Sequence, residues 1–310
     1  MNQLENILGL PNKAKDFEDF WTNQKRKIDE MKITYELKKT DLYSPLGDYY
    51  DLYFRSFDQA LLHAKYIVPK IEGKKPVMIE FHDVNKASES WHHLSRYLAI
   101  DMAVIALDCR NQGGESKDES SYEGPYTMTP LMLGIQGQCE EMYYVKSYLD
   151  AYLCSRLIEK ISDLDENKIA TFGKGQGGGM AFVCACLNPN IKKCSVEHLF
   201  PSDIQSVYNH NKESEHYKGV SMYFRNIDSS HQYENEIFNR LSYIDCLNFS
   251  KYFHASLLMG TGLLDASTPA FSQYALFNQI QAQKKHCVYS KHEHELINFY
   301  ENENMEFLRW

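Results

Sequence analysis

Residues 169–181 read IATFGKGQGGGMA: an apolar, strand-like run ends in a cluster of glycines and passes directly into a helical pattern. So abrupt a change requires small residues, because the strand and the helix pass close to each other. Gly173 and Gly177 stand at the flanking positions of the nucleophile elbow G-x-S-x-G, in which a nucleophilic side chain sits at the tip of the turn. The tip residue of this chain, where that motif has serine, is Gly175.

Two other glycine-rich motifs compete with the elbow. Gly173, Gly175 and Gly178 also fit G-x-G-x-x-G, which is typical of dinucleotide-binding loops. Such a loop follows the first strand of its unit and precedes an acidic residue by about 20 positions. Glu197 has that spacing, but the segment lies past the middle of the chain, which disfavours a nicotinamide-dependent oxidoreductase. A phosphate loop is disfavoured because no Gly-Lys-Ser/Thr ends the run.

Strand-like and helical patterns alternate on both sides of this segment, which predicts an α/β protein. Alternation of this kind produces a mostly parallel sheet with helices on both faces. Ligands bind to such sheets beyond the carboxyl ends of the strands. A small β-rich N-terminal extension, over 49–54 and 61–68, follows an amphipathic helix over 16–27. We expect further strands over 76–81, 102–107, 168–172, 194–199 and 255–259, and helices over 90–100, 136–161, 177–187, 268–282 and 295–308.

The composition is that of an ordinary globular protein: 43% of the 310 residues are hydrophobic and 24% are charged. A formal net charge of −9 without any basic run argues against nucleic acid or an anionic membrane as the main partner. No apolar stretch approaches the roughly 18 residues of a membrane span, and the start has no signal-peptide pattern, so we expect a cytoplasmic protein. We expect a single domain over 1–310, with a cap-like insertion at about 205–240, where the sequence is polar and irregular.

Seven short motifs follow one another along the chain. They are LP at 10–11 with DFEDFW at 16–21, FHDVN at 81–85, DCRNQGG at 108–114, GKGQGG at 173–178, LSYID at 241–245 with NF at 248–249, LLD at 263–265 with Pro269, and HE at 294–295. In these motifs the chain resembles the acetyl xylan esterase/cephalosporin C deacetylase group of α/β-hydrolases (carbohydrate esterase family 7). Each motif alone is modest, but seven in the right order and at the right spacing form a specific match over nearly the whole chain.

The resemblance implies an α/β-hydrolase fold and serine-type hydrolysis of small O-acetyl esters. In that family a Ser, an Asp and a His follow one another along the chain; the Ser attacks the ester, the His takes its proton and the Asp orients the imidazole. Carried onto this chain, the acid is Asp265 and the base is His294, and the backbone N–H groups of Val84 and Gln176 form the oxyanion hole. The nucleophile position is Gly175 and is vacant. The ring-like assemblies of the family imply a homo-oligomer.

The chain departs from the family motifs at four positions near the predicted site. Gly175 replaces Ser, Val84 and Asp83 replace the Tyr and the Gly of F-H-G-Y-N, and Asn111 replaces the first Gly of R-G-Q-G-G. Glycine at the tip of a strained turn relieves backbone strain while it removes the nucleophile. Asp83 is the most adverse change, since an extra carboxylate beside the oxyanion turn opposes a developing negative charge.

These observations predict a serine ester hydrolase scaffold on which hydrolysis is absent or much reduced, so its status as an enzyme stays open. Two alternatives remain: a non-catalytic binder or sensor of acylated sugars or metabolites, and an active esterase whose Ser was deliberately substituted at position 175. We expect a small acetylated substrate or ligand and no cofactor. We also expect no metal, because the His-Glu-His-Glu run at 292–295 lacks the i, i+4 helical His pair of a metalloprotease.

Overall fold

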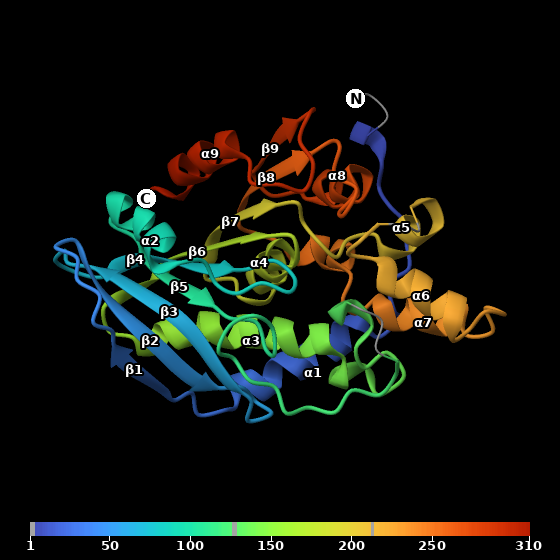
Figure 1. Cartoon of the computed structure of the whole chain (residues 1–310), viewed down its shortest axis with the longest axis horizontal. Helices are drawn as coiled ribbons and strands as arrows, with labels where there is room; N and C mark the ends of the chain where they lie inside the picture. The colour runs from blue at the N-terminus through green and yellow to red at the C-terminus, as the bar shows by residue number, and fades with distance from the viewer. Residues whose placement is uncertain (1–3, 126–128, 212–213) are drawn as a thin grey trace.

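A nine-stranded sheet forms the centre of the molecule (Figure 1), in the order β1-β2-β3-β5-β4-β6-β7-β8-β9. The computed structural model describes residues 4–125, 129–211 and 214–310. The first three strands pair antiparallel, β3 pairs antiparallel with β5, and all pairs from β5 to β9 are parallel. The strands are β1 Tyr35–Lys39, β2 Gly47–Arg55, β3 Leu61–Pro69, β4 Lys75–Phe81, β5 Ala103–Leu107, β6 Leu164–Lys174, β7 Ile191–Glu197, β8 Ser256–Gly262 and β9 Lys284–Tyr289.

Helices cover both faces of this sheet. On one face α1, α3, α4 and α8 surround the larger apolar cluster. On the other face α2, the 3-10 helix that follows it and α9 enclose a smaller cluster. The α-helices are α1 Phe17–Asp29, α2 Trp91–Leu94, α3 Tyr143–Leu157, α4 Gln176–Leu187, α5 Ile204–His210, α6 Lys218–Asn226, α7 Glu234–Leu241, α8 Ala270–Gln279 and α9 Asn298–Leu308.

The predicted α/β-hydrolase fold is confirmed, with its mostly parallel sheet, helices on both faces and β-rich N-terminal extension. Two helices differ most from the sequence prediction. The helix predicted over 90–100 is one α-helical turn, α2, followed by the 3-10 helix Ser95–Ile100, and the chain leaves it at Asp101 in a left-handed conformation. The helix predicted over 136–161 begins only at α3, because Met142 is extended and separates α3 from a preceding 3-10 turn.

Two edge strands escape the sequence analysis. β1 reads YELKK and is exposed at most of its positions, and β9 reads KKHCVY and is nowhere fully buried. Neither segment has the apolar run or the strict alternation that predicts a strand. Charged residues on edge strands protect them from pairing with other chains. The same residues interrupt the apolar pattern from which a strand is predicted.

The cap-like segment after β7 is helical rather than irregular. It contains α5, α6 and α7, which lie together at one end of the sheet (Figure 1). α6 buries Val220 and Phe224, and α7 buries Ile237 and Leu241. The exposed positions of both helices are polar, so the mean composition of the segment conceals two short amphipathic helices.

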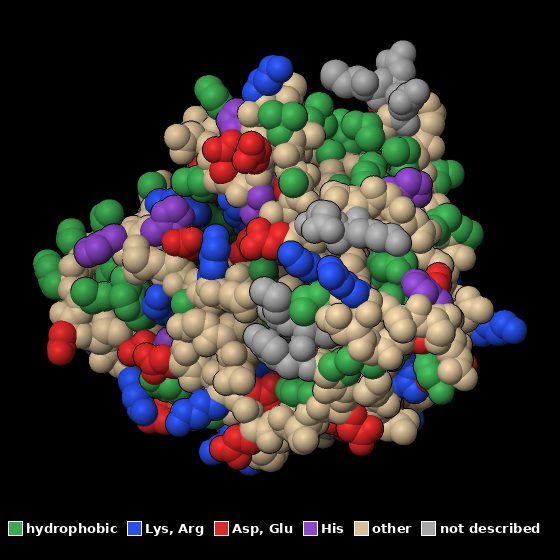
Figure 2. Space-filling model, turned by 45° about the vertical axis from the view of Figure 1, so that its right-hand side comes forward, with side chains coloured by type: hydrophobic (Ala, Val, Ile, Leu, Met, Phe, Trp, Pro, Cys, Tyr) green, Lys and Arg blue, Asp and Glu red, His purple; other side chains and the backbone are tan. Residues whose placement is uncertain are grey.

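The charges on the surface and the lengths of the helices are relevant to whether the protein binds nucleic acid or a membrane. Figure 2 shows acidic and basic side chains interspersed over the face that it presents. Among the described residues, no helix is both long and apolar enough to cross a membrane. The absence of a nucleic-acid partner stays a prediction.

Candidate active site

The glycine cluster forms a sharp strand-to-helix turn at the carboxyl end of β6. Gly175 lies between β6 and α4 with φ +54° and ψ −120°, a conformation that L-amino acids other than glycine adopt only under strain. A Cβ on Gly173 would lie 2.1 Å from the carbonyl oxygen of Gly177, and a Cβ on Gly177 would lie 2.0 Å from that of Phe81. The two flanking glycines are therefore required by the close passage of strand and helix, as in a nucleophile elbow.

The predicted acid and base lie together at the same end of the sheet. Asp265 follows β8, and His294 lies in the connection from β9 to α9. The Nδ1 atom of His294 lies 2.9 Å from Oδ2 of Asp265. The other oxygen of Asp265 accepts hydrogen bonds from the backbone N–H groups of Ser267, at 2.9 Å, and Thr268, at 2.8 Å. These bonds fix the carboxylate, and the carboxylate in turn fixes the orientation of the imidazole.

The carboxylate of Asp83 fills the place where a nucleophile's side chain would lie. A Cβ added to Gly175 would be 1.9 Å from Oδ1 of Asp83. On its other side, Oδ2 of Asp83 lies 2.9 Å from Nε2 of His294, the atom that takes the proton of a serine in a triad. His294 thus lies between Asp265 and Asp83. An oxygen of Asp83 occupies the position expected for the serine hydroxyl of a triad.

The same carboxylate also takes both predicted oxyanion-hole donors. The backbone N–H of Val84 donates to Oδ1 of Asp83 at 2.7 Å, and that of Gln176 donates to the same oxygen at 3.0 Å. The structure therefore brings together all five site residues predicted from the sequence, and Asp83 lies at their centre. The sequence marks Asp83 as an adverse change beside the turn; the structure places its charge inside the predicted oxyanion hole.

Burial and charge set the protonation state of this group. Burial favours the neutral acid of Asp83, but hydrogen bonds from His216 and His294 outweigh it and hold the pKa of Asp83 well below its usual range. Burial likewise disfavours the charged form of His294, but Asp265 and Asp83 outweigh it and raise the pKa of His294 to about 9. The carboxylate is therefore ionised and the imidazole protonated at neutral pH.

Two histidines beside this group were not singled out by the sequence. His198 directly follows β7, and its Nδ1 atom lies 2.8 Å from Oδ2 of Asp265. His216 comes from the α5–α6 connection, and its Nε2 atom lies 3.4 Å from Oδ1 of Asp83. A position directly after a parallel strand is a usable signal for His198. No local pattern marks His216. Its position at the site depends on how α5 and α6 pack, which the sequence does not reveal.

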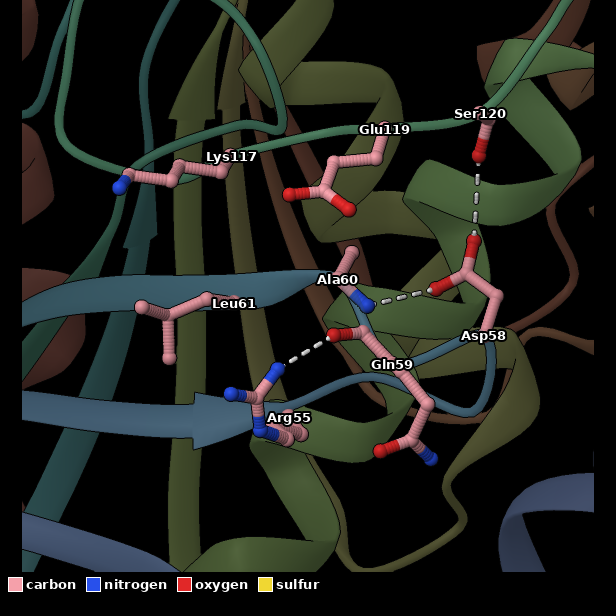
Figure 3. Close-up of a pocket in the computed structure, with 8 residues that line it drawn as sticks. All are labelled: Arg55, Asp58, Gln59, Ala60, Leu61, Lys117, Glu119 and Ser120. Carbon is pink, nitrogen blue, oxygen red and sulfur yellow. Dashed lines mark hydrogen bonds between the residues drawn. The ribbon is translucent and has the colours of Figure 1, made fainter.

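A pocket of about 510 Å³ lies elsewhere, at the β2–β3 turn (Figure 3). It is lined in part by Arg55, Asp58 and Lys117, and none of its lining residues belongs to the elbow, the acid or the base. Asp58 lies 2.8 Å from the buried guanidinium of Arg110 and accepts a hydrogen bond from the backbone N–H of Ala60. Its carboxylate is thus committed to holding the fold, and we do not assign the chemistry to this pocket.

Raising the pH is expected to weaken the folded state through His294. Its pKa of about 9 in the fold exceeds the ordinary value of 6.5, so protonation stabilises the folded state. That contribution is fully present below pH 6.5 and is lost as the pH rises through about 9; the difference in pKa corresponds to about 3 kcal/mol. Urea denaturation at about pH 6 and about pH 9.5 measures it. A His294→Gln variant should lack this drop, and an equal drop in both proteins would contradict the assignment.

Comparison with known proteins identifies the family of the chain. The sequence matches the acetyl xylan esterase family over residues 1–310. The chain belongs to this family. Acetyl esterase Axe7A of Xylanibacter ruminicola is 24% identical over 297 residues, which make up 90% of this chain and 63% of that protein. The chain thus spans less than two thirds of the length of this curated relative.

Two solved acetyl xylan esterases share the whole architecture. Acetyl xylan esterase 1 from Thermoanaerobacterium sp. JW/SL YS485 superposes with a TM-score of 0.96 at 31% identity, over 99% of this chain and 97% of that one. The acetyl xylan esterase from Paenibacillus sp. R4 has a TM-score of 0.94 at 26% identity, over 99% and 98%. The acylaminoacyl peptidase of Pyrococcus horikoshii, at 16% identity and a TM-score of 0.61, shares the fold alone. The family resemblance drawn from the motifs is confirmed.

Proposed function

We propose that this member of the acetyl xylan esterase family keeps the ester-hydrolase scaffold but has lost serine-type hydrolysis of small O-acetyl esters, wholly or nearly so. One observation carries the proposal: the ionised carboxylate of Asp83 lies where the nucleophile's side chain would be and accepts both predicted oxyanion-hole N–H groups.

Three steps of serine-type catalysis are each opposed. Gly175 has no hydroxyl to attack the ester carbon. The carbonyl oxygen of a substrate would need the N–H groups of Val84 and Gln176, which already bind an anion. His294 has a pKa of about 9, so at neutral pH it carries a proton and has no free lone pair to act as a base. Stabilisation of the oxyanion is usually the largest single contribution to acyl transfer, so the blocked hole argues against hydrolysis even by water.

The two alternatives fare differently. A substitution made only to trap a ligand would change the serine and leave the remaining motif intact, whereas here Asp83 occupies the space that Gly175 leaves. This close fit indicates that the glycine at position 175 and the aspartate at position 83 arose together, and it argues against a single deliberate substitution of the serine. A binder of acetylated ligands would have to hold the acetyl group without the oxyanion hole, and no described contact favours that function over the first.

The direct test is acetate release from p-nitrophenyl acetate by the unmodified protein and by His294→Ala. We expect equal, near-background rates, because His294 is already held by two carboxylates. A turnover of the unmodified protein on the order of 10 s⁻¹, typical of enzymes, would refute the loss of activity. A lower rate in His294→Ala than in the unmodified protein would show that the imidazole still works as a base.

Three further expectations rest on the sequence alone and stay predictions: a single domain over 1–310, assembly as a homo-oligomer and a cytoplasmic location. Size-exclusion chromatography with light scattering of the unmodified protein tests the second of these directly.

A further inference from the structure

We propose that Asp83, His216 and His294 bind one divalent transition-metal ion, with Zn²⁺ as the best match. The inference goes beyond the loss of serine chemistry, since it gives the rebuilt site a ligand of its own. It also departs from the expectation drawn from the sequence, in which a metal is disfavoured because the His-Glu-His-Glu run at 292–295 lacks the i, i+4 helical His pair of a metalloprotease.

The distances between the three side chains suit a single ion. Their ligand atoms lie within 4.8 Å of one another. Nε2 of His294 is 2.9 Å from one oxygen of Asp83, and Nε2 of His216 is 3.4 Å from the other. Two donors bound to zinc at about 2.1 Å and at the tetrahedral angle are about 3.4 Å apart. Both separations from Asp83 are within about 0.5 Å of this value, so the three side chains can surround one ion once they adjust to it.

The groups around two of the three ligands, His294 and Asp83, are those that orient ligands in metal sites. A ligating histidine commonly donates its second N–H to a carboxylate, and Nδ1 of His294 lies 2.9 Å from Asp265, which leaves Nε2 as the metal-binding atom. A metal ion that binds there displaces the proton of Nε2. A ligating carboxylate is commonly hydrogen-bonded as well. Asp83 accepts hydrogen bonds from the backbone N–H groups of Val84 and Gln176, which hold its carboxylate in place.

Packing positions His216, whose ring has one hydrogen bond, from Nε2 to Asp83. The ring of Phe200 meets it edge-on at 5.1 Å, and the neighbouring Tyr217 exchanges hydrogen bonds with the backbone of Ser202. Only 7% of His216 is exposed, and its Nδ1 atom has no partner among the described residues. Because its Nε2 atom faces the carboxylate of Asp83, this buried imidazole is placed to bind a cation between the two groups.

The charge of the cluster also favours a cation. Asp83 and Asp265 are both at least nine-tenths buried, and both carboxylates face ring nitrogens of His294. Buried charges are usually paired or coordinate metals. Two histidines and one carboxylate form a donor set that suits Zn²⁺ and its first-row neighbours, with a further position left for water. The side chain of His294 is 14% exposed, which gives that position access to solvent.

A second group, His198, Asp265 and His294, also places three donors together. It is the weaker candidate because Asp265 is already saturated. Its Oδ2 atom accepts from the hydroxyl of Thr268 at 2.6 Å and faces Nδ1 of His294, while its Oδ1 atom accepts two backbone N–H groups. We therefore assign Asp265 to the outer shell of the site.

The test is metal binding by the untagged, chelator-treated full chain without any substrate. Co²⁺ is titrated and followed by its visible absorption, and Zn²⁺ binding is measured by calorimetry. We expect one equivalent per chain. His216→Ala and Asp83→Asn should each abolish the saturable Co²⁺ spectrum, and Asp265→Asn should weaken binding by about 10–100-fold, as outer-shell changes do. Because two different ligands are tested, misfolding of one variant, visible by circular dichroism, leaves the other to decide.

His231→Ala is the matched control, because His231 also lies in the cap-like segment beside a carboxylate, that of Glu234, but outside the cluster. It should bind Co²⁺ like the unmodified protein. Absence of saturable binding in the unmodified protein, or unchanged binding in His216→Ala, would overturn the proposal. Loss of binding in His198→Gln but not in His216→Ala would also overturn it, in favour of the second group. None of these outcomes bears on serine-type hydrolysis, which is assayed separately in the presence of EDTA.

Discussion

The double variant Asp83→Gly/Gly175→Ser is expected to release acetate from p-nitrophenyl acetate at least about 10³-fold faster than the unmodified protein. The first change empties the slot and frees the N–H groups of Val84 and Gln176. The second places a hydroxyl at the tip of the turn. Without the Asp83 carboxylate, His294 loses one of the two charges that raise its pKa, so its Nε2 atom becomes available as a base at neutral pH.

Neither single change should achieve this gain. In Gly175→Ser alone, the new Cβ would lie 1.9 Å from Oδ1 of Asp83, and the oxyanion hole stays filled. In Asp83→Gly alone, the slot is open but holds no nucleophile. A triple variant that adds His294→Ala should return to background if the restored activity uses the predicted base. A folded double variant with no gain would show that the site is impaired by more than this exchange, with Val84 and Asn111 as the remaining departures from the family motifs.

Gly175→Ser alone is expected to lower the free energy of unfolding by about 2–4 kcal/mol. Part of that cost is backbone strain, because the residue has φ +54°. The remainder is overpacking against Asp83, which its own hydrogen bonds hold in place. In the Asp83→Gly background the second part disappears, so the double variant should be more stable than the sum of the two single changes predicts, by about 1–3 kcal/mol. Urea denaturation of the four proteins measures this coupling.

Gly73→Ser separates the two contributions. Gly73 has φ +75°, but a Cβ there would meet no atom within 4 Å. Its substitution therefore reports backbone strain without overpacking. We expect Gly73→Ser to cost at least about 1 kcal/mol less than Gly175→Ser and to show no coupling to Asp83→Gly. Equal costs, or additive effects of Asp83→Gly and Gly175→Ser, would contradict the close contact between residues 83 and 175.

Local patterns in the sequence predict most of the fold. Apolar runs such as 102–107 predict buried parallel strands because such strands contact helices on both faces, and they become β5 and its neighbours. The glycines at 173 and 177 predict the elbow because the close approach that they permit is a property of adjacent segments. The edge strands and the short cap helices are missed because many of their residues are polar and exposed. Packing against the rest of the protein stabilises these elements, and their own sequence periodicity is weak.

The sequence also predicts which residues stand at the acid, base and elbow positions, because its motifs resemble those of the family in the same order along the chain. Only the tertiary structure decides what these residues do to one another. Asp83 and Gly175 are far apart in the sequence, and the parallel pairing of β4 with β6 brings their carboxylate and turn into contact. His216 arrives from a cap whose helices are positioned by burial of their apolar faces. Contacts of this kind depend on where strands and helices end in space, which no local pattern encodes.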